Sequence, residues 1–91
     1  MFTYEIKQYI KNTYYKKKIN NDSKYFNYFK IEQDGSENIV SLMDIQNDLK
    51  FKFPDYKGNI CKFSLMKKIL TKQEFKFNLK INFLPVNNIH Q

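Results

Sequence analysis

Apolar and polar residues alternate along the stretch from Glu74 to Leu84. The apolar members occupy every second position: Phe75, Phe77, Leu79, Ile81 and Phe83. The positions between them are lysine or asparagine. Successive side chains of an extended chain point to opposite faces, so this alternation would place all the apolar groups on one side. We therefore predict a long β-strand over residues 74–84, with an apolar face toward the core and a polar face toward water or an anion.

The first third of the chain contains a predicted helix and a predicted strand. Apolar residues recur at three- and four-residue spacing within residues 1–18, which is typical of a helix with one apolar face. After the turn-forming residues 20–23, residues 25–33 are rich in aromatic side chains and end at Asp34-Gly35-Ser36, which indicates a strand. Because a lone strand leaves its backbone groups unpaired, this strand is the predicted partner of residues 74–84.

Two short helices are predicted within residues 41–71. Ser41 precedes Asp44 by three residues, a spacing that favours a helix N-terminus and predicts a helix over residues 42–50. The Phe53-Pro54 pair should end this helix, because the residue before a proline is pushed out of the helical conformation.

The second of these helices is predicted over residues 65–70, with Ser64 as its N-cap. Residues 57–59 form the predicted turn between the two helices, and residues 71–73 form the predicted link into the long strand. Pro85 should end that strand and leave residues 85–91 as a tail.

This order of elements predicts one small α+β domain across residues 1–91. A winged helix is a small fold with these parts. In a winged helix, residues 65–70 would form the recognition helix, and the strand over residues 74–84 would form an arm of the wing.

The 91 residues carry a formal net charge of +7, and all 16 basic residues are lysines. Residues 1–45 hold 7 lysines and 6 acids, whereas residues 46–91 hold 9 lysines and 3 acids. The positive charge is therefore concentrated in the half that contains the long predicted strand. Alanine and arginine are both absent, a composition that an A+T-rich coding sequence also produces. The lysine excess is thus either functional or a result of coding bias.

Six lysines in the second half are candidates for a phosphate-binding face: Lys62, Lys67, Lys68, Lys72, Lys76 and Lys80. Each would act as a mobile point charge on a nucleic-acid backbone, and the alternative is a solvated lysine face. Without arginine the bidentate reading of guanine is not possible, so binding would be largely non-specific. Core packing is the favoured role of the aromatics in residues 25–33, but an outward-facing Tyr28 or Phe26 would suit stacking on an unpaired base.

Few residues suit catalysis or metal binding. Asp44 and Asp48 are one helical turn apart, a spacing at which two carboxylates can share a divalent cation. However, Asp44 is also explained as an acid that stabilises the first turn of the helix, and the sequence shows no third ligand. Cys61, the single cysteine, has no identified base and is expected in the core. His90 has no partner for general base catalysis. We predict a protein that is not an enzyme and that uses no metal, cofactor or small-molecule substrate.

The single cysteine excludes an internal disulfide and fits an intracellular, reducing compartment. The sequence has no run of about 18 apolar residues that would span a membrane, and its first residues do not resemble a signal peptide. The predicted helix over residues 1–18 would also suit an anionic membrane surface, although the core needs its apolar face equally.

The segments SLMDIQNDLKFKF and FSLMKKILTKQEFKFNLKINFLPVNN resemble the DNA-binding region of mariner-type transposases, over about residues 39–88. The matching positions are Ser41, Ile45 and Leu49 in the first helix, Ser64, Lys67, Lys68, Ile69 and Leu70 in the second, and Pro85 and Asn88 in the following loop. The chain has Leu65-Met66 where that family has a Ser-Thr pair and arginine, and the family's acidic catalytic domain is not within these 91 residues. The resemblance implies a detached DNA-binding domain without strand-transfer activity.

Two functions fit these observations. The first is a small, basic, non-enzymatic module that binds DNA or RNA through phosphate contacts. The second is a small structural or interaction protein, such as a subunit of a ribonucleoprotein or organellar complex, or a viral or phage protein that binds and inhibits a host complex. The 7 tyrosines and 9 phenylalanines favour the second function, because a core of this size does not readily hide them all.

Overall fold

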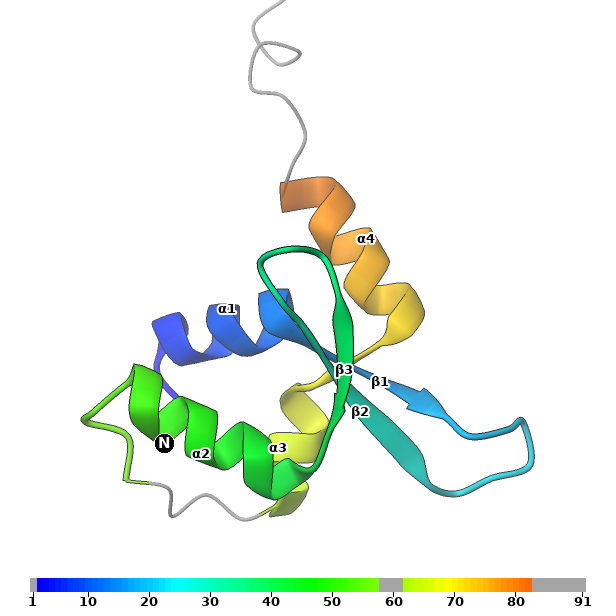
Figure 1. The fold of residues 1–91 in the computed structure, drawn as a ribbon, viewed down its shortest axis with the longest axis horizontal. Helices are drawn as coiled ribbons and strands as arrows, with labels where there is room; N and C mark the ends of the chain where they lie inside the picture. Colours follow the sequence, from blue (N-terminus) through cyan, green and yellow to red (C-terminus); the bar gives the residue numbers. More distant parts are fainter. Residues whose placement is uncertain (1, 58–61, 83–91) are drawn as a thin grey trace, which may run out of the picture.

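The computed structural model describes residues 2–57 and 62–82 (Figure 1). Its helices are α1 (Tyr4–Thr13), α2 (Leu42–Lys52), α3 (Lys62–Lys68) and α4 (Lys72–Asn82). Its strands are β1 (Tyr14–Lys18), β2 (Phe26–Ile31), β3 (Glu37–Val40) and β4 (Leu70–Thr71). The predicted α+β class is confirmed. The described residues do not include several positions named above: Gly58, Asn59, Cys61, Phe83, Leu84 and the tail with Pro85 and His90.

The strands form one mixed sheet in the order β3-β2-β1-β4. β2 pairs antiparallel with β1 and with β3, whereas β1 and β4 pair in parallel over two residues of each strand. The strand predicted over residues 25–33 is therefore confirmed as β2, but its predicted partner was wrong. β2 pairs with the strands immediately before and after it in the chain, through residues 19–25 and residues 32–36. The second connection includes Gly35 at a φ of 87°.

The helix predicted over residues 1–18 ends early, at Thr13. Thr3 caps its start, because the Thr3 side chain accepts a hydrogen bond from the Ile6 N–H at 3.2 Å. Tyr14 is already extended, with φ −125° and ψ 146°. The prediction of a helix was wrong for residues 14–18, which form β1. The β-branched and aromatic side chains at positions 13–15 favour a strand, and β2 supplies its pairing partner.

The helix predicted over residues 42–50 is confirmed as α2. Ser41 and Asp44 form a complete capping box: the Ser41 N–H donates to the Asp44 carboxylate at 2.9 Å, and the Asp44 N–H donates to the Ser41 hydroxyl at 3.0 Å. The helix ends at Lys52, and Phe53, the residue before Pro54, is its non-helical C-cap, as the Phe53-Pro54 pair predicted.

The second short helix is present, but its predicted boundaries were wrong by about one turn. α3 starts at Lys62, so Ser64 lies inside the helix rather than before it. Leu65 and Ile69, one helical turn apart, are 0% and 1% exposed, and they fix which side of this segment faces the core. Leu70 leaves the helix to pair with Tyr15 in β4.

The long strand predicted over residues 74–84 was wrong, because residues 72–82 form α4. Thr71 and Glu74 explain this outcome: the Thr71 N–H donates to Glu74 at 2.9 Å and the Glu74 N–H donates to the Thr71 hydroxyl at 3.2 Å. The alternating residues separate onto different helix sides, so Phe75 is 4% exposed while Phe77 is 64% exposed. Without this strand, the predicted wing arm is also absent from the described residues.

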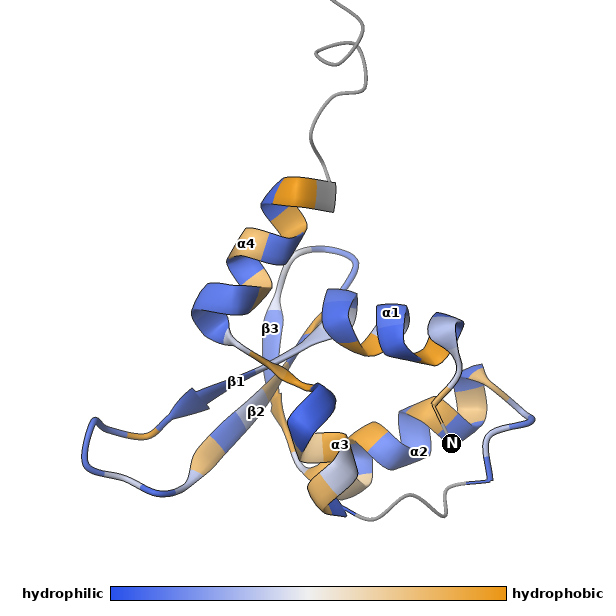
Figure 2. Ribbon diagram, turned by 180° about the vertical axis from the view of Figure 1, so that it is seen from behind, coloured by the Kyte–Doolittle hydropathy of each residue, from blue (hydrophilic) through white to orange (hydrophobic). Residues whose placement is uncertain are grey.

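The sheet has helices on both faces. Tyr14 and Tyr28 lie on one face and join the core cluster with buried residues of α1, α2 and α3. Figure 2 shows the apolar sides of α1 and α2 turned toward each other. On the opposite face, the Tyr15 ring contacts Phe29 at 5.0 Å and Phe75 of α4 at 5.5 Å between ring centroids. None of the four described helices has the length and apolarity needed to cross a bilayer.

Candidate nucleic-acid interface

A groove of about 650 Å³ opens between the β1–β2 hairpin and the first turns of α4. We call it the lysine groove, and its lining residues are Lys16, Lys17, Lys18, Phe26, Thr71, Lys72, Gln73 and Lys76. No carboxylate is among them. The far end of the hairpin that forms one wall extends away from the helices (Figure 1).

The pairing of β1 with β2 positions the lysines of the first wall. Lys18 pairs with Phe26, so these two side chains share a face of the sheet, and Lys17 lies on the other face. The Lys16 ammonium donates to the Met66 carbonyl at 3.0 Å, which ties the hairpin to the end of α3. The Phe26 ring lies 5.1 Å from the Lys16 ammonium and 5.7 Å from that of Lys18.

The helical spacing of α4 positions the second wall. Lys72 and Lys76 are four residues apart, so they lie on one side of the helix. Phe75 anchors that helix on Tyr15, and the Asn78 amide donates to the Lys11 carbonyl at 3.3 Å. These contacts hold α4 against the sheet and the end of α1.

The electrostatic field of the lysine groove is dominated by its five lysines. None of them forms an ion pair with a carboxylate in the described part of the chain, where both ion pairs belong to Lys30. Glu74 is near enough for Lys16 to contribute to lowering the pKa of its carboxyl, although hydrogen bonds with Thr71 are the larger cause. Clustered cations without bound counter-charges create a positive potential that attracts polyanions.

The structure brings together only two of the six predicted site lysines, Lys72 and Lys76. Lys62, Lys67 and Lys68 lie on α3, and Lys80 lies farther along α4, so none of these four lines the groove. The Lys67 ammonium instead lies 4.4 Å from the centre of the Phe63 ring.

Sequence reasoning missed the three lysines of β1. The predicted helix over residues 1–18 treated them as a basic helix end, whereas they form the strand of an exposed hairpin. The Thr13-Tyr14-Tyr15 run and the turn residues 20–23 are the signals that could have identified this hairpin. Of the two aromatics considered for base stacking, Tyr28 is buried in the core cluster, and Phe26 is partly buried against that cluster and also lines the groove.

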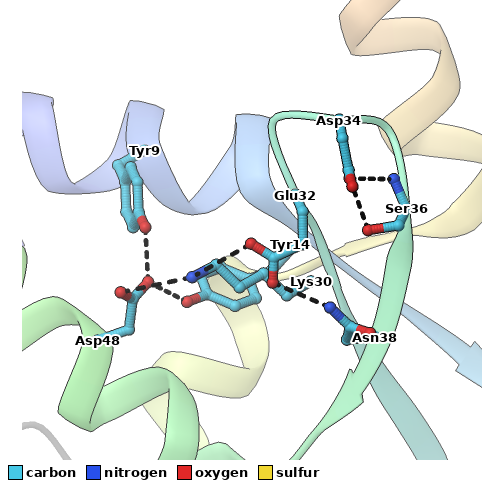
Figure 3. Close-up of polar contacts among 8 residues, drawn as sticks. All are labelled: Tyr9, Tyr14, Lys30, Glu32, Asp34, Ser36, Asn38 and Asp48. Atoms are coloured by element: carbon cyan, nitrogen blue, oxygen red, sulfur yellow. Dashed lines mark hydrogen bonds and ion pairs between the residues drawn. The ribbon is translucent and has the colours of Figure 1, made fainter.

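A second polar cluster is centred on Asp48 (Figure 3). The Tyr9 hydroxyl donates to Asp48 at 2.6 Å, the Tyr14 hydroxyl donates to the same oxygen, and the Lys30 ammonium lies 3.6 Å from the other oxygen. Burial opposes ionisation of Asp48, but the two hydroxyl hydrogen bonds and Lys30 lower its pKa overall. Burial and the adjacent carboxylate raise the pKa of both tyrosines.

These contacts also account for the two carboxylates considered for a metal. Asp44 completes the cap of α2, and Asp48 is occupied by Tyr9, Tyr14 and Lys30. Within residues 2–57 and 62–82, no three side chains of the metal-binding types gather at one place. The Asp48 cluster adjoins an open groove whose lining mixes Lys30 and Lys52 with acids. The lysine groove is therefore the stronger candidate for a polyanion site.

Comparisons of the chain with models of protein families, with curated proteins and with solved structures give no match. The resemblance to mariner-type transposases therefore stays a prediction from the residues quoted above.

Proposed function

We propose that this protein is a small, basic, non-enzymatic nucleic-acid-binding module that contacts the phosphate backbone through a lysine face. One observation carries the proposal: five lysines from two separate elements line one groove, and none of the described lining residues carries a carboxylate. An intracellular location belongs to this proposal, because Cys61 is the single cysteine of the chain.

The chemistry of the groove suits the phosphate backbone of a nucleic acid. Lysine ammonium groups on flexible side chains act as point charges that follow a charged backbone without reading its sequence. Lys17, Lys18 and Lys76 are exposed and can move to meet phosphate oxygens. Lys16 and Lys72 are partly buried, and contacts with the Met66 carbonyl and the Tyr15 ring hold them in place.

The test compares two variants that carry the same net charge. The groove variant replaces four groove lysines by glutamine: Lys17→Gln, Lys18→Gln, Lys72→Gln and Lys76→Gln. The control variant makes the same replacement outside the groove: Lys7→Gln, Lys11→Gln, Lys50→Gln and Lys57→Gln. Each variant lowers the net charge from +7 to +3.

Fluorescence anisotropy with a labelled oligonucleotide at several salt concentrations provides the measurement. For the wild type we expect affinity to fall steeply with salt, because each phosphate contact releases a bound counterion. The groove variant should lose most of its affinity, and its salt slope should flatten by about 0.7 for each lysine that contacts a single strand. The control variant should retain most of its affinity and most of its salt dependence. Equal losses in the two variants, or no wild-type binding at low salt, would contradict the proposal.

A specific observation also supports the second candidate function, a small structural or interaction protein. Several large apolar side chains are strongly exposed, among them Phe51 at 87%, Tyr4 at 76% and Phe77 at 64%. Side chains of this kind are typical of the centre of protein interfaces. Size-exclusion chromatography over a range of concentrations, together with a pull-down, tests this function. A monomer that captures no protein partner would count against it.

A further inference from the structure

We propose that the lysine groove holds a single strand of nucleic acid, with a base stacked on Phe26, rather than the outer surface of a duplex. This inference rests on the proposed function and names the form of nucleic acid. Four features of the described residues carry it: cations from two elements in one groove, an aromatic ring in the lining, an open strand edge, and an α3 that is poorly suited to a duplex groove.

The cations of the groove lie on two walls. Lys16, Lys17 and Lys18 come from β1, and Lys72 and Lys76 come from α4. A single strand is narrow enough for its phosphates to be reached from both sides. Proteins that bind single strands follow the backbone with a positively charged groove of this kind. Charge on both walls therefore favours a single strand.

Phe26 supplies an aromatic ring to the groove, on the sheet face that it shares with Lys16 and Lys18. Its ring is part of the groove lining, and the Lys16 and Lys18 ammonium groups lie 5.1 Å and 5.7 Å from its centre. Tyr25, the preceding residue, is 76% exposed. Proteins that bind single strands without sequence preference combine such aromatic rings with a positive groove, because every base has a π-face. In a duplex, the base faces are already stacked on one another.

The outer edge of β1 is open beside these side chains. β4 pairs only with Tyr15 and Lys16, so in the described part of the chain no strand neighbours β1 on this side at Lys17 and Lys18. An exposed strand edge presents unpaired backbone N–H and C=O groups. Such groups can hydrogen-bond an extended ligand, and base edges are exposed in a single strand.

α3 does not offer the alternative of a helix inserted into the major groove of a duplex. It has seven residues, Leu65 faces the core, and its Met66 carbonyl accepts a hydrogen bond from Lys16. The Lys67 ammonium lies over Phe63, and the chain has no arginine to read guanine.

The experiment measures the affinity of the full chain for two labelled probes at low salt. One probe is a ten-nucleotide oligothymidylate, and the other is a duplex of the same length. We expect the single strand to bind at least fivefold more tightly. Phe26→Leu should weaken single-strand binding by about fivefold or more, because it removes one stacking surface, and should leave duplex binding unchanged.

The matched control is Phe51→Leu, the same replacement on an exposed side chain of α2 outside the groove. It should leave both affinities unchanged, and thermal melting confirms that each variant is folded at the temperature of the titration. Equal or tighter binding of the duplex, or equal loss for both probes in Phe26→Leu, would overturn this inference while leaving the proposed function in place. Failure of both probes to bind the wild type would instead remove the proposed function.

Discussion

Asp48 joins three elements through one carboxylate. It accepts hydroxyl hydrogen bonds from Tyr9 of α1 and Tyr14 of β1, and it pairs with Lys30 of β2 (Figure 3). Tyr14 is 1% exposed, so its hydroxyl needs this partner inside the protein. Tyr56 is the contrasting case. It is 7% exposed and stacked on Phe2, and its hydroxyl has no partner among the described residues.

We predict opposite outcomes for the same replacement at these two tyrosines. Tyr14→Phe removes a hydrogen bond to a charged group, and should lower the free energy of unfolding by about 1.5–3 kcal/mol. Tyr56→Phe removes a buried hydroxyl that has no described partner, and should be neutral within about 0.5 kcal/mol or stabilising. Urea unfolding followed by circular dichroism measures both. A loss for Tyr56→Phe as large as that for Tyr14→Phe would contradict this assignment.

The Asp48 cluster also predicts a pH dependence of stability. The pKa of the Asp48 carboxyl is lower in the folded chain than the ordinary aspartate value of about 3.9. The stabilisation by ionised Asp48 is therefore present above about pH 4 and is lost as the pH falls through the folded pKa.

We expect the difference in unfolding free energy between the wild type and Asp48→Asn to be constant from about pH 5 to 7, and to shrink below about pH 4. The exposed Asp55 provides the control, and Asp55→Asn should stay within about 0.5 kcal/mol of the wild type at each pH. A difference for Asp48→Asn that stays unchanged down to pH 2 would contradict the proposed hydrogen-bonding role.

Among the elements, α4 shows where a sequence pattern misleads. Strict alternation is a strong strand signal, but helical spacing places Phe75 and Leu79 on one side of the same segment. Thr71 and Glu74 decide between the two, since their side chains complete a helix N-terminus. The same logic correctly predicted α2 from Ser41 and Asp44. In this segment the Thr71–Glu74 capping pair was therefore a better guide than apolar alternation. Capping logic was not reliable everywhere, because the predicted N-cap Ser64 lies inside α3.

Two phenylalanines distinguish the helix from the predicted strand. In a strand, Phe75 and Phe77 would share a face, and their replacement by alanine would cost similar amounts. In α4, Phe75→Ala should cost about 3–5 kcal/mol because the ring is buried against Tyr15. Phe77→Ala should stay within about 0.5 kcal/mol of the wild type because the ring is 64% exposed. Thermal or urea unfolding measures both, and similar losses would contradict the helix.

The lysine groove was beyond prediction from the sequence because its walls come from distant parts of the chain. Lys18 and Lys72 are 54 positions apart, and tertiary contacts bring their elements together: the parallel pairing of β4 with β1 and the packing of Phe75 on Tyr15. Composition and charge distribution identified lysines of the second half of the chain as candidates for phosphate binding. Of these, Lys72 and Lys76 do line the groove. A two-residue strand has no reliable pattern of its own, so its register could not be predicted.

Concentrated positive charge should reduce the stability of the folded chain. Like charges in the groove repel each other and are screened by salt. Lys17 and Lys76 form no ion pair or hydrogen bond in the described structure, so Lys17→Gln with Lys76→Gln should raise the unfolding free energy by about 0.5 kcal/mol at low salt. The gain should vanish in 0.5 M salt. Lys7→Gln with Lys50→Gln is the control, and an equal gain there would show that net charge alone is responsible.

The two-residue pairing of β4 with β1 makes ligand binding and folding thermodynamically linked. The walls of the groove meet only in the folded chain, so an anion that bridges them should bind the native state in preference to the unfolded state. Such linkage stabilises the native state by about 2.7 kcal/mol when the ligand is present at one hundred times its Kd. An oligonucleotide should therefore raise the melting temperature of the wild type. It should do the same for the control variant, in which Lys17, Lys18, Lys72 and Lys76 are unchanged. The groove variant should melt at the same temperature with or without it, which makes a simple melting curve a readout of groove occupancy.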